Sequence, residues 1–341
     1  MGYWLEGNLC AMQTVQVGTT GRTTTQLGYG CSSLMGAMSR AESLAVLETA
    51  FDAGIRHFDV APMYGYGQAE SVLGEFLVRH HAEVTVTTKY GIPPPKRQSF
   101  IGIARSVARP LVKALPGLKR GLTSAAAKAT GAGPKASFTA AEAHESLACS
   151  LRELKTDRID IWLLHDATLA DLHDEGLLRL MLESVATGKI GTFGVGGGRA
   201  AIDEIAAARP HYLPVAQFAW SVLDAPVPAS SSFRIHHRAL TDNFRNLHQQ
   251  LLGDKALCTR WSGLVGSDLA DPQGLSALML KAALLENASG IVLFSSKRDK
   301  HIRNNVAVAQ DATLESPARR FYALIQSEAA IAGPWNERAA G

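Results

Sequence analysis

Short apolar β-runs alternate with helix-like segments along most of this chain, and this order restricts the possible folds more than any other feature. Eight runs are rich in strand-favouring residues and bounded by turn residues. They cover residues 26–30, 56–60, 84–88, 159–164, 190–195, 213–218, 233–237 and 290–294. Helical spacing lies between most of them, at residues 41–53, 69–80, 140–154, 175–186, 202–208 and 242–252. Eight such units favour a (β/α)8 TIM barrel over an open doubly wound sheet.

Helix-start residues support this alternation of strands and helices, and only the sixth unit departs from it. Ser39 precedes Glu42, and Thr139 precedes Glu142, with the spacing of a capping box, so a helix is expected to begin after each. Between the sixth and seventh runs, residues 219–232 contain two prolines and no helical period. That crossover is therefore predicted to be a loop.

The remaining segments are expected to lie outside the repeated units. Residues 15–17 and 23–27 flank a turn as a β-hairpin that would close the floor of the barrel. Residues 1–14 and 331–341 are predicted to be tails of a single domain that covers residues 15–330. An insertion at about 93–138 would leave the barrel after the third strand.

The insertion is basic. It carries nine positive charges, and no acidic residue lies between Glu83 and Glu142; the nine are Lys96, Arg97, Arg105, Arg109, Lys113, Lys119, Arg120, Lys128 and Lys135. The simplest interpretation is a solvated excursion. The alternative is a lid over the active face, or a surface that attracts anionic substrates. Nucleic-acid binding is not expected, because few aromatic residues accompany the charges.

Composition is that of a soluble globular protein. Hydrophobic residues make up 46% and charged residues 19% of the 341 residues, and no apolar run approaches the roughly 20 residues that span a membrane. No signal peptide is evident, and the four cysteines form no Cys-x-x-Cys pair, so a cytoplasmic protein without a structural metal is expected. The oligomeric state is expected to be a monomer or a small homo-oligomer.

Chemically useful side chains follow three of the predicted strands. Asp59 lies near the end of the second run and Tyr64 follows it, Lys89 follows the third run and His165 follows the fourth. In a barrel, the carboxyl ends of the strands form one active face, so these four groups are expected to converge. Any one of them has an ordinary structural explanation, as a loop cap, rim aromatic, strand terminus or core imidazole. Together they suit the transfer of a proton at a carbonyl.

The chain resembles the aldo-keto reductase superfamily over nearly its whole length. The resemblance is carried by Phe58-Asp59-x-Ala61-x-x-Tyr64-Gly65-x-Gly67-x-x-Glu70, Thr87-Thr88-Lys89, Leu163-Leu164-His165-Asp166 and the segment 295–305. It implies an NADP(H)-dependent oxidoreductase that interconverts a carbonyl compound (an aldehyde, ketone or sugar) and an alcohol. It also implies that Tyr64 is the general acid in reduction and the general base in oxidation.

Elementary chemistry agrees with these roles. Hydride reduction of a carbonyl leaves an alkoxide that needs a proton, and a free phenol with a pKa of about 10 donates poorly at neutral pH. The Lys89 ammonium is expected to lower the pKa of Tyr64, and Asp59 to pair with Lys89. His165 would donate a hydrogen bond to the substrate oxygen.

The last strand leads into a cluster of cations and hydroxyls at a predicted helix start, which suits a phosphate. By resemblance this is the site of the adenosine 2′-phosphate, which favours NADPH over NADH. Gln217 resembles the glutamine that holds the nicotinamide carboxamide. The expected cofactor-binding set is Cys31, Asp59, Gln217, Arg238, Ser296, Lys297, His301, Asn304 and Asn305.

Two positions depart from the family pattern. His301 stands where many relatives have an arginine, and Gly196-Gly197-Gly198 replaces a Ser-Asn pair near the carboxamide. The glycine run is not a Rossmann fingerprint, because the third glycine is missing and the run lies in mid-chain. The alternative to an enzyme is an NADPH-binding regulatory or interaction subunit with little turnover.

The substrate pocket is expected to be largely apolar, as small-molecule sites are. Sugar aldehydes, simple aldehydes and ketones all suit such a pocket. The alternative is that the reaction runs in the other direction, as oxidation of a sugar lactol. The expected lining residues include Met35, Met63, Tyr66, Trp220 and Trp261, and each of them is equally suited to the core or the rim.

Overall fold

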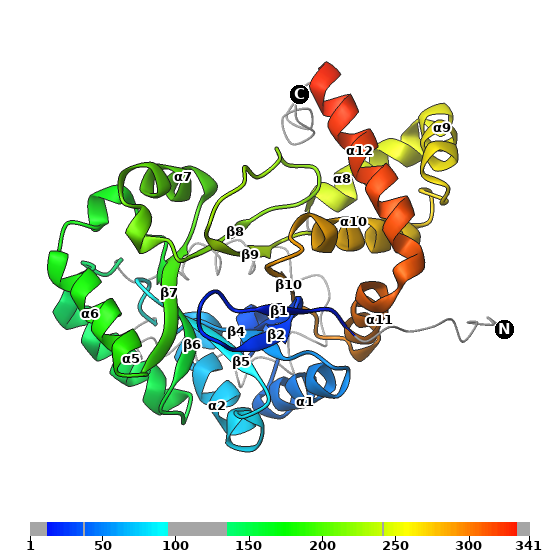
Figure 1. The fold of residues 1–341 in the computed structure, drawn as a ribbon. Helices are drawn as coiled ribbons and strands as arrows, with labels where there is room; N and C mark the ends of the chain where they lie inside the picture. The colour runs from blue at the N-terminus through cyan, green and yellow to red at the C-terminus, as the bar shows by residue number, and fades with distance from the viewer. Residues whose placement is uncertain (1–11, 37, 95–134, 241, 333–341) are drawn as a thin grey trace, which may run out of the picture.

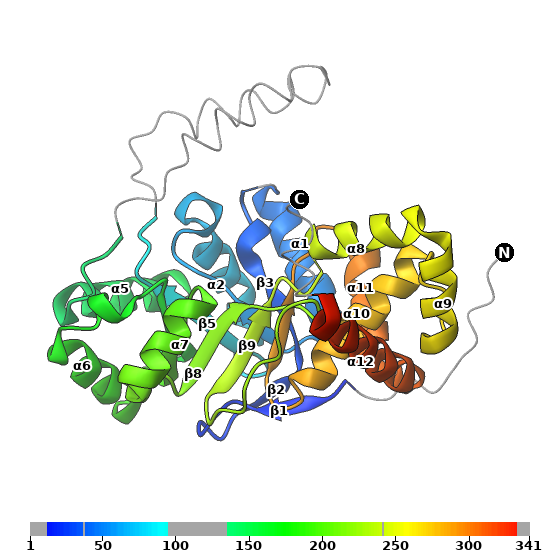
Figure 2. The same cartoon turned by 90° about the horizontal axis from the view of Figure 1, so that it is seen from above.

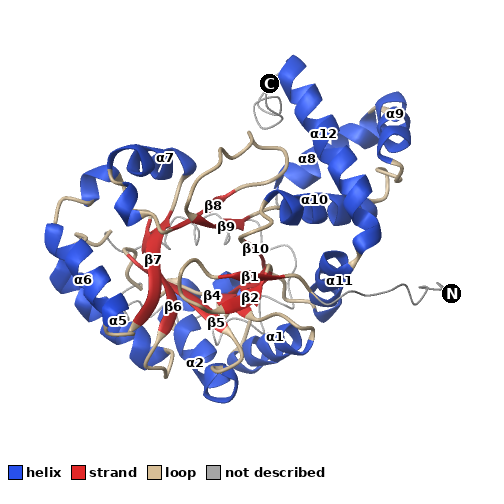
Figure 3. Ribbon diagram, in the orientation of Figure 1, coloured by secondary structure: helices blue, strands red, loops and turns tan. Residues whose placement is uncertain are grey.

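Eight parallel strands form a closed barrel that helices surround (Figure 1 and Figure 3). The computed structural model describes residues 12–36, 38–94, 135–240 and 242–332. The strands pair in the order β10-β3-β4-β5-β6-β7-β8-β9. The predicted (β/α)8 TIM barrel is therefore confirmed. Most of the predicted basic insertion, residues 95–134, lies outside the described residues.

All eight predicted strands are present, with ends that differ by at most two residues. They are β3 (Leu27–Gly30), β4 (His57–Asp59), β5 (Thr85–Tyr90), β6 (Ile159–His165), β7 (Ile190–Gly196), β8 (Val215–Ala219), β9 (Phe233–His237) and β10 (Ile291–Phe294). Neighbouring strands are joined by continuous parallel ladders, and β10 pairs with β3 to close the ring. Apolar side chains that alternate along these strands fill the barrel, as closure requires.

The helices cover the outside of this ring. They are α1 (Arg40–Asp52), α2 (Ala69–His80), α5 (Ala140–Glu153), α6 (Glu175–Ala186), α7 (Arg199–Ala208), α8 (Asp242–Gly253), α9 (Lys255–Val265), α10 (Pro272–Glu286), α11 (Asp299–Gln310) and α12 (Glu315–Ala332). In Figure 1, α8, α9, α10 and α12 gather on one side of the barrel. Within the described ranges, no helix is both long and apolar enough to cross a lipid bilayer.

The two predicted helix starts are capped differently. Ser39 forms a full capping box, because its hydroxyl accepts from the Glu42 amide and the Glu42 carboxylate accepts from the Ser39 amide at 2.7 Å. Thr139 also accepts from the Glu142 amide, but the Glu142 carboxylate accepts from the backbone of Ser137 at 2.8 Å. Helix α5 therefore begins with only half of the predicted capping box.

A hairpin closes the amino-terminal end of the barrel. Strands β1 (Thr14–Gln16) and β2 (Thr23–Thr25) pair antiparallel, and Val15 and Val17 join the apolar cluster inside the barrel. Arg22 fastens the turn, since it donates to the Val84 carbonyl at 2.7 Å and lies 3.4 Å from the Asp160 carboxylate. Figure 2 shows this hairpin at one end of the strands. The predicted floor is confirmed, and the first strand begins at Thr14, within the segment expected to be a tail.

The sixth crossover is a loop, as the prolines indicated. Residues 220–232 contain no helix, and α12 covers this part of the barrel instead. The Tyr322 ring packs edge-on to Trp220 at 6.3 Å, and Gln326 donates to the Val222 carbonyl at 3.4 Å. The last helix ends at Ala332, so it extends just beyond the domain boundary expected at residue 330; the division into one domain and two tails stays a prediction.

Gly194 tests how tightly the barrel wall is packed. A Cβ at this β7 position would overlap the backbone of Val215 on β8, where no side chain can move aside. We expect Gly194→Ala to lower the free energy of unfolding by about 2 kcal/mol or more. Gly263→Ala on α9 is the matched control, because no atom of the described residues lies within 4 Å of its Cβ, and it should stabilise by up to about 1 kcal/mol. Urea titrations of both variants check this; equal effects would contradict it.

Candidate active site

The barrel register brings the predicted acid and amine together at the carboxyl end. Asp59 is the last residue of β4, and Lys89 lies near the end of β5. Lys89 Nζ donates to Asp59 Oδ1 at 2.6 Å and to the Val60 carbonyl at 3.0 Å. Both side chains are buried, at 2% exposure for Lys89 and 4% for Asp59. The predicted ion pair is therefore present inside the barrel mouth.

Gln217 joins this pair. Its side-chain nitrogen donates to the second carboxylate oxygen of Asp59 at 2.7 Å, and the glutamine is itself 3% exposed. Gln217 comes from β8, on the other side of the barrel from β4 in strand order. No local sequence pattern indicated this contact, because it depends on closure of the ring.

Tyr64 lies directly beside Lys89. It begins the short 3-10 helix η2 (Tyr64–Gly67), and Lys89 Nζ lies 5.3 Å from the centre of its ring. The His165 ring, at the end of β6, meets the Tyr64 ring edge-on at 6.4 Å. All four residues of the predicted catalytic set are thus neighbours.

The Lys89 ammonium lowers the pKa of Tyr64, as expected from the sequence. However, burial and the negative charge of Asp59 outweigh this effect, so the pKa of the phenol lies above its ordinary value. For Lys89, burial opposes the charge, but Asp59 and Tyr64 outweigh burial and raise the pKa of the amine. The resting state therefore contains a protonated phenol beside an ammonium, which is the state of a proton donor.

Three neutral histidines surround the ion pair. Burial lowers the pKa of His165 to about 3, and it lowers the pKa of His57 and of His237 to about 4. His57 bridges two hydroxyls on β5, with Nδ1 at 2.9 Å from Thr85 and Nε2 at 3.3 Å from Thr87. His165 Nδ1 is buried and has no hydrogen-bond partner among the described residues. A neutral imidazole here can donate a hydrogen bond without carrying a charge.

Strained backbone marks the same end of the barrel. Met35, Tyr66, Phe138, Asp166 and Arg238 have positive φ between 52° and 65° and lie in loops that follow strands. Such conformations cost of order 1–3 kcal/mol each and persist where the surroundings enforce them. Gly65 also has a positive φ of 58°, and a Cβ there would press against the Leu34 carbonyl. Periodicity and composition do not reveal this strain.

Glu70, the last residue of the motif that runs from Phe58 to Glu70, has a structural role. It is buried near the start of α2, and Thr88 on β5 donates to its carboxylate at 2.6 Å. Burial raises the pKa of Glu70, with the Thr88 hydrogen bond acting in the opposite direction. Glu70 thus ties the helix after Tyr64 to the strand of Lys89. Sequence reasoning assigned this residue no role.

The segment between β10 and α11 provides a cationic helix start. Ser296 and Lys297 lie on this segment and His301 in the first turn of α11, and no side chain of the described residues caps that turn. Ser295 donates to the Gly30 carbonyl at 2.5 Å, and Tyr29 donates to the Ser296 carbonyl at 2.7 Å. These bonds hold the segment against β3. Uncapped amides and exposed cations at one helix start form a suitable site for a phosphate.

The other expected cofactor residues also lie at the carboxyl end of the barrel, after β3, after β9 and on α11. Cys31 follows β3 and is fully buried, and burial raises the pKa of its thiol well above the usual range. Arg238 follows β9 with an exposed side chain. Asn304 and Asn305 lie in the second turn of α11. The structure brings Cys31 close to Asp59 and Lys89 but gives no contact that assigns it a role.

The two tryptophans expected in the substrate pocket are both buried. Trp261 lies on α9 with no exposed surface and packs in the core. Trp220 is 3% exposed, and its indole donates to the Ala225 carbonyl at 3.0 Å. Met35 and Met63 are half-buried, and Tyr66 is exposed. Trp261 is thus a core residue, which is the alternative that the sequence left open, and the place of Trp220 beside the pocket stays a prediction.

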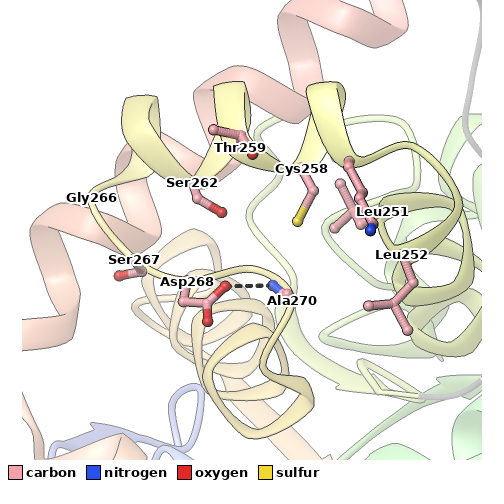
Figure 4. A pocket seen from close by; sticks show the side chains of 10 residues that line it. Leu251, Leu252, Cys258, Thr259, Ser262, Gly266, Ser267, Asp268 and Ala270 are labelled. Atoms are coloured by element: carbon pink, nitrogen blue, oxygen red, sulfur yellow. Dashed lines mark hydrogen bonds between the residues drawn. The ribbon is translucent and has the colours of Figure 1, made fainter.

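A separate surface pocket of about 710 Å³ lies on the outer helices. Figure 4 shows Cys258 and Ser262 of α9 on one side and Asp268 on the other, with Leu251 and Leu252 of α8 at one end. None of the catalytic candidates lines it. Among the described residues, no cluster of three or more histidine, cysteine or acidic side chains is arranged to hold a metal ion.

Comparison with known proteins finds one matching family and several similar enzymes. The family model described as "Aldo/keto reductase family" matches residues 26–226. A pyridoxal 4-dehydrogenase from Microbacterium luteolum is 44% identical over 87 residues, which cover 25% of each chain. A D-threo-aldose 1-dehydrogenase from a Pseudomonas species is 36% identical over 154 residues, which cover 43% of this chain and 41% of the relative. The matched stretches thus span well under two thirds of these relatives.

The fold also resembles solved structures. An aldo-keto reductase from Klebsiella pneumoniae in complex with NADPH superposes with a TM-score of 0.57 at 16% identity. The superposition covers 95% of this chain and 96% of the other. At this identity the likeness supports the fold alone.

Proposed function

Because the chain belongs to the aldo/keto reductase family, we propose that it is an NADP(H)-dependent oxidoreductase that interconverts a carbonyl compound and an alcohol. The observation that carries this proposal is the contact set around Lys89, with Asp59 at 2.6 Å and the Tyr64 ring at 5.3 Å. A buried ammonium that faces both a carboxylate and a phenol is an arrangement for proton transfer.

In the proposed reduction, Tyr64 gives its phenolic proton to the carbonyl oxygen as the carbonyl carbon gains a hydride. When bound, the reduced nicotinamide supplies that hydride. Lys89 stabilises the phenolate that remains, and Asp59 keeps the ammonium in place. His165 donates a hydrogen bond to the substrate oxygen in its neutral form. Reprotonation of Tyr64 from solvent completes the cycle, and oxidation of the alcohol runs in the opposite direction.

The residues present suit the cofactor. The uncapped start of α11, with Ser296, Lys297 and His301, would hold the 2′-phosphate, and Asn304 and Asn305 would face the adenosine. Gln217 would bind the carboxamide, and Cys31, Asp59 and Arg238 would line the nicotinamide and diphosphate. His165 Nδ1, which has no partner among the described residues, leaves an unsatisfied polar group in the barrel mouth, as a site for a polar ligand does.

We infer the substrate class from the two relatives' names. Pyridoxal and aldoses both carry an aldehyde with a hydroxyl in the same molecule, and such compounds close into cyclic hemiacetals. If the hemiacetal carbon gave its hydride to NADP+ and the hydroxyl gave its proton to the Tyr64 phenolate, the products would be a lactone and NADPH. We therefore propose hydroxyaldehydes as the first substrates to test.

The test measures absorbance at 340 nm with purified protein. NADPH is mixed with aldehydes, ketones and quinones, and NADP+ with aldoses and pyridoxal. Turnover in either direction supports the proposal. Binding of NADPH without turnover across the whole panel would instead favour the regulatory subunit.

Lys297 provides a test of the phosphate site that does not depend on turnover. We expect Lys297→Ala to weaken NADPH binding by about tenfold and to leave NADH binding unchanged, because only NADPH presents the 2′-phosphate to this cation. Fluorescence titration gives both dissociation constants. Lys255→Ala, on α9 away from this segment, is the matched control. An equal loss of NADPH and NADH affinity would contradict the assignment.

A further inference from the structure

Gln217 shares the carboxylate of Asp59 with Lys89. Each oxygen of Asp59 accepts one hydrogen bond, from Lys89 at 2.6 Å and from Gln217 at 2.7 Å. A carboxylate only accepts, so the amide nitrogen of Gln217 must face it, and this fixes the orientation of the amide. The position of the carboxylate relative to Lys89 therefore depends on Gln217.

The other end of the amide faces the glycine run after β7. A Cβ built on Gly196 would lie 3.1 Å from Gln217 Oε1, so the oxygen points across the space that this glycine leaves. Gly196 also pairs with His165 on β6 and with Gln217 on β8. The amide thus spans from the ion pair to the glycine run after β7.

The surroundings make the ion pair sensitive to this contact. The titratable groups that face it are the Glu70 carboxyl on α2 and five others, namely Tyr64 on η2, Cys31 on the 3-10 helix η1 (Cys31–Ser33), His57 on β4, His165 on β6 and His237 on β9. The pKa values of the phenol and thiol are raised and those of the imidazoles are lowered, so all five are uncharged at neutral pH. The field at Tyr64 is then set mainly by how Asp59 and Lys89 share their charge.

We propose that Gln217 is a positioning residue for the proton donor, with its amide nitrogen holding Asp59 in place beside Lys89. Because the proposed function already assigns the carboxamide to Gln217, the same amide would couple the bound nicotinamide to Tyr64. Without the amide, the carboxylate interacts with Lys89 alone, and the ammonium acts less on the phenol. The coupling rests on the proposed function, but the hold on Asp59 can be measured without cofactor or substrate.

The experiment titrates Tyr64 by its phenolate absorbance near 295 nm, as the difference between each protein and its Tyr64→Phe counterpart. We expect Gln217→Met to raise the Tyr64 midpoint by about half a pH unit or more, and Gln217→Glu to raise it at least as far because it adds negative charge. Gln26→Met is the matched control, since Gln26 is a buried barrel glutamine that bonds the Leu284 carbonyl at 2.6 Å. Its midpoint should equal that of the wild type.

Kinetics and binding complete the test. At saturating NADPH, we expect kcat to fall about tenfold in Gln217→Met and less than twofold in Gln26→Met. An unchanged Tyr64 midpoint in both Gln217 variants, with weaker NADPH binding alone, would overturn the positioning role. If no protein turns over any carbonyl, the proposed function fails, whereas the Tyr64 titration still decides whether Gln217 acts on the phenol. Circular dichroism confirms that each variant is folded.

Discussion

Tyr64→Phe is expected to lower kcat for carbonyl reduction by about 10³-fold while the dissociation constant of NADPH changes less than twofold. The phenol is the group that faces both Lys89 and His165, and general acid catalysis typically contributes 10² to 10⁴ in rate. Removal of one oxygen leaves the aromatic packing intact. Steady-state rates at saturating cofactor check the expected change in kcat, and fluorescence titration checks the dissociation constant of NADPH.

Tyr322→Phe is the control for Tyr64→Phe. Tyr322 packs against Trp220 on the outside of the barrel, so the same loss of an oxygen should leave kcat within twofold of the wild type. A Tyr64→Phe enzyme with more than a tenth of the wild-type rate would require a different proton donor.

Lys89→Met is expected to reduce both stability and activity strongly. It leaves the Asp59 charge in a site that is 4% exposed, and removal of one partner of a buried pair typically costs about 3–5 kcal/mol. The rate of reduction should fall at least about 100-fold, because the phenolate loses its counter-charge. Urea unfolding gives the stability, and saturating kinetics the rate.

The double variant Asp59→Asn with Lys89→Met separates these two effects. It removes both charges, so most of the lost stability should return while activity stays absent. The Asp59→Asn change keeps a side-chain oxygen that can still accept from Gln217, which limits the alteration to the charge pair. A double variant that is no more stable than Lys89→Met alone would show that Lys89 stabilises the barrel by packing rather than by pairing with Asp59.

The barrel and the central residues of the site could both be predicted from the sequence, because one pattern of strands determines both. Strand periodicity and turn residues define the eight runs, and parallel strands place their carboxyl ends together. Asp59, Lys89 and His165 each follow or end such a run, so their meeting requires only the topology. Tyr64 comes with Asp59 because the short loop between them cannot carry it far.

Other parts of the site depend on packing that the sequence does not encode locally. Gln217 reaches Asp59 only because the ring closes, and the net rise in the pKa of Tyr64 reflects burial that outweighs the expected effect of Lys89. The left-handed backbone at Tyr66 has no periodic signal. Trp261 was expected at the pocket and lies in the core, since hydrophobicity alone does not separate these environments.

The central claim is that a hydride and the Tyr64 proton reach one carbonyl group in this barrel mouth. It is tested most directly with NADPH that carries deuterium at both C4 positions and an aldehyde that the enzyme reduces. Mass spectrometry of the alcohol should show one deuterium on the former carbonyl carbon for each NADPH consumed, with the reaction nearly abolished in Tyr64→Phe. Alcohol without deuterium, or equal product from both proteins, would contradict the account.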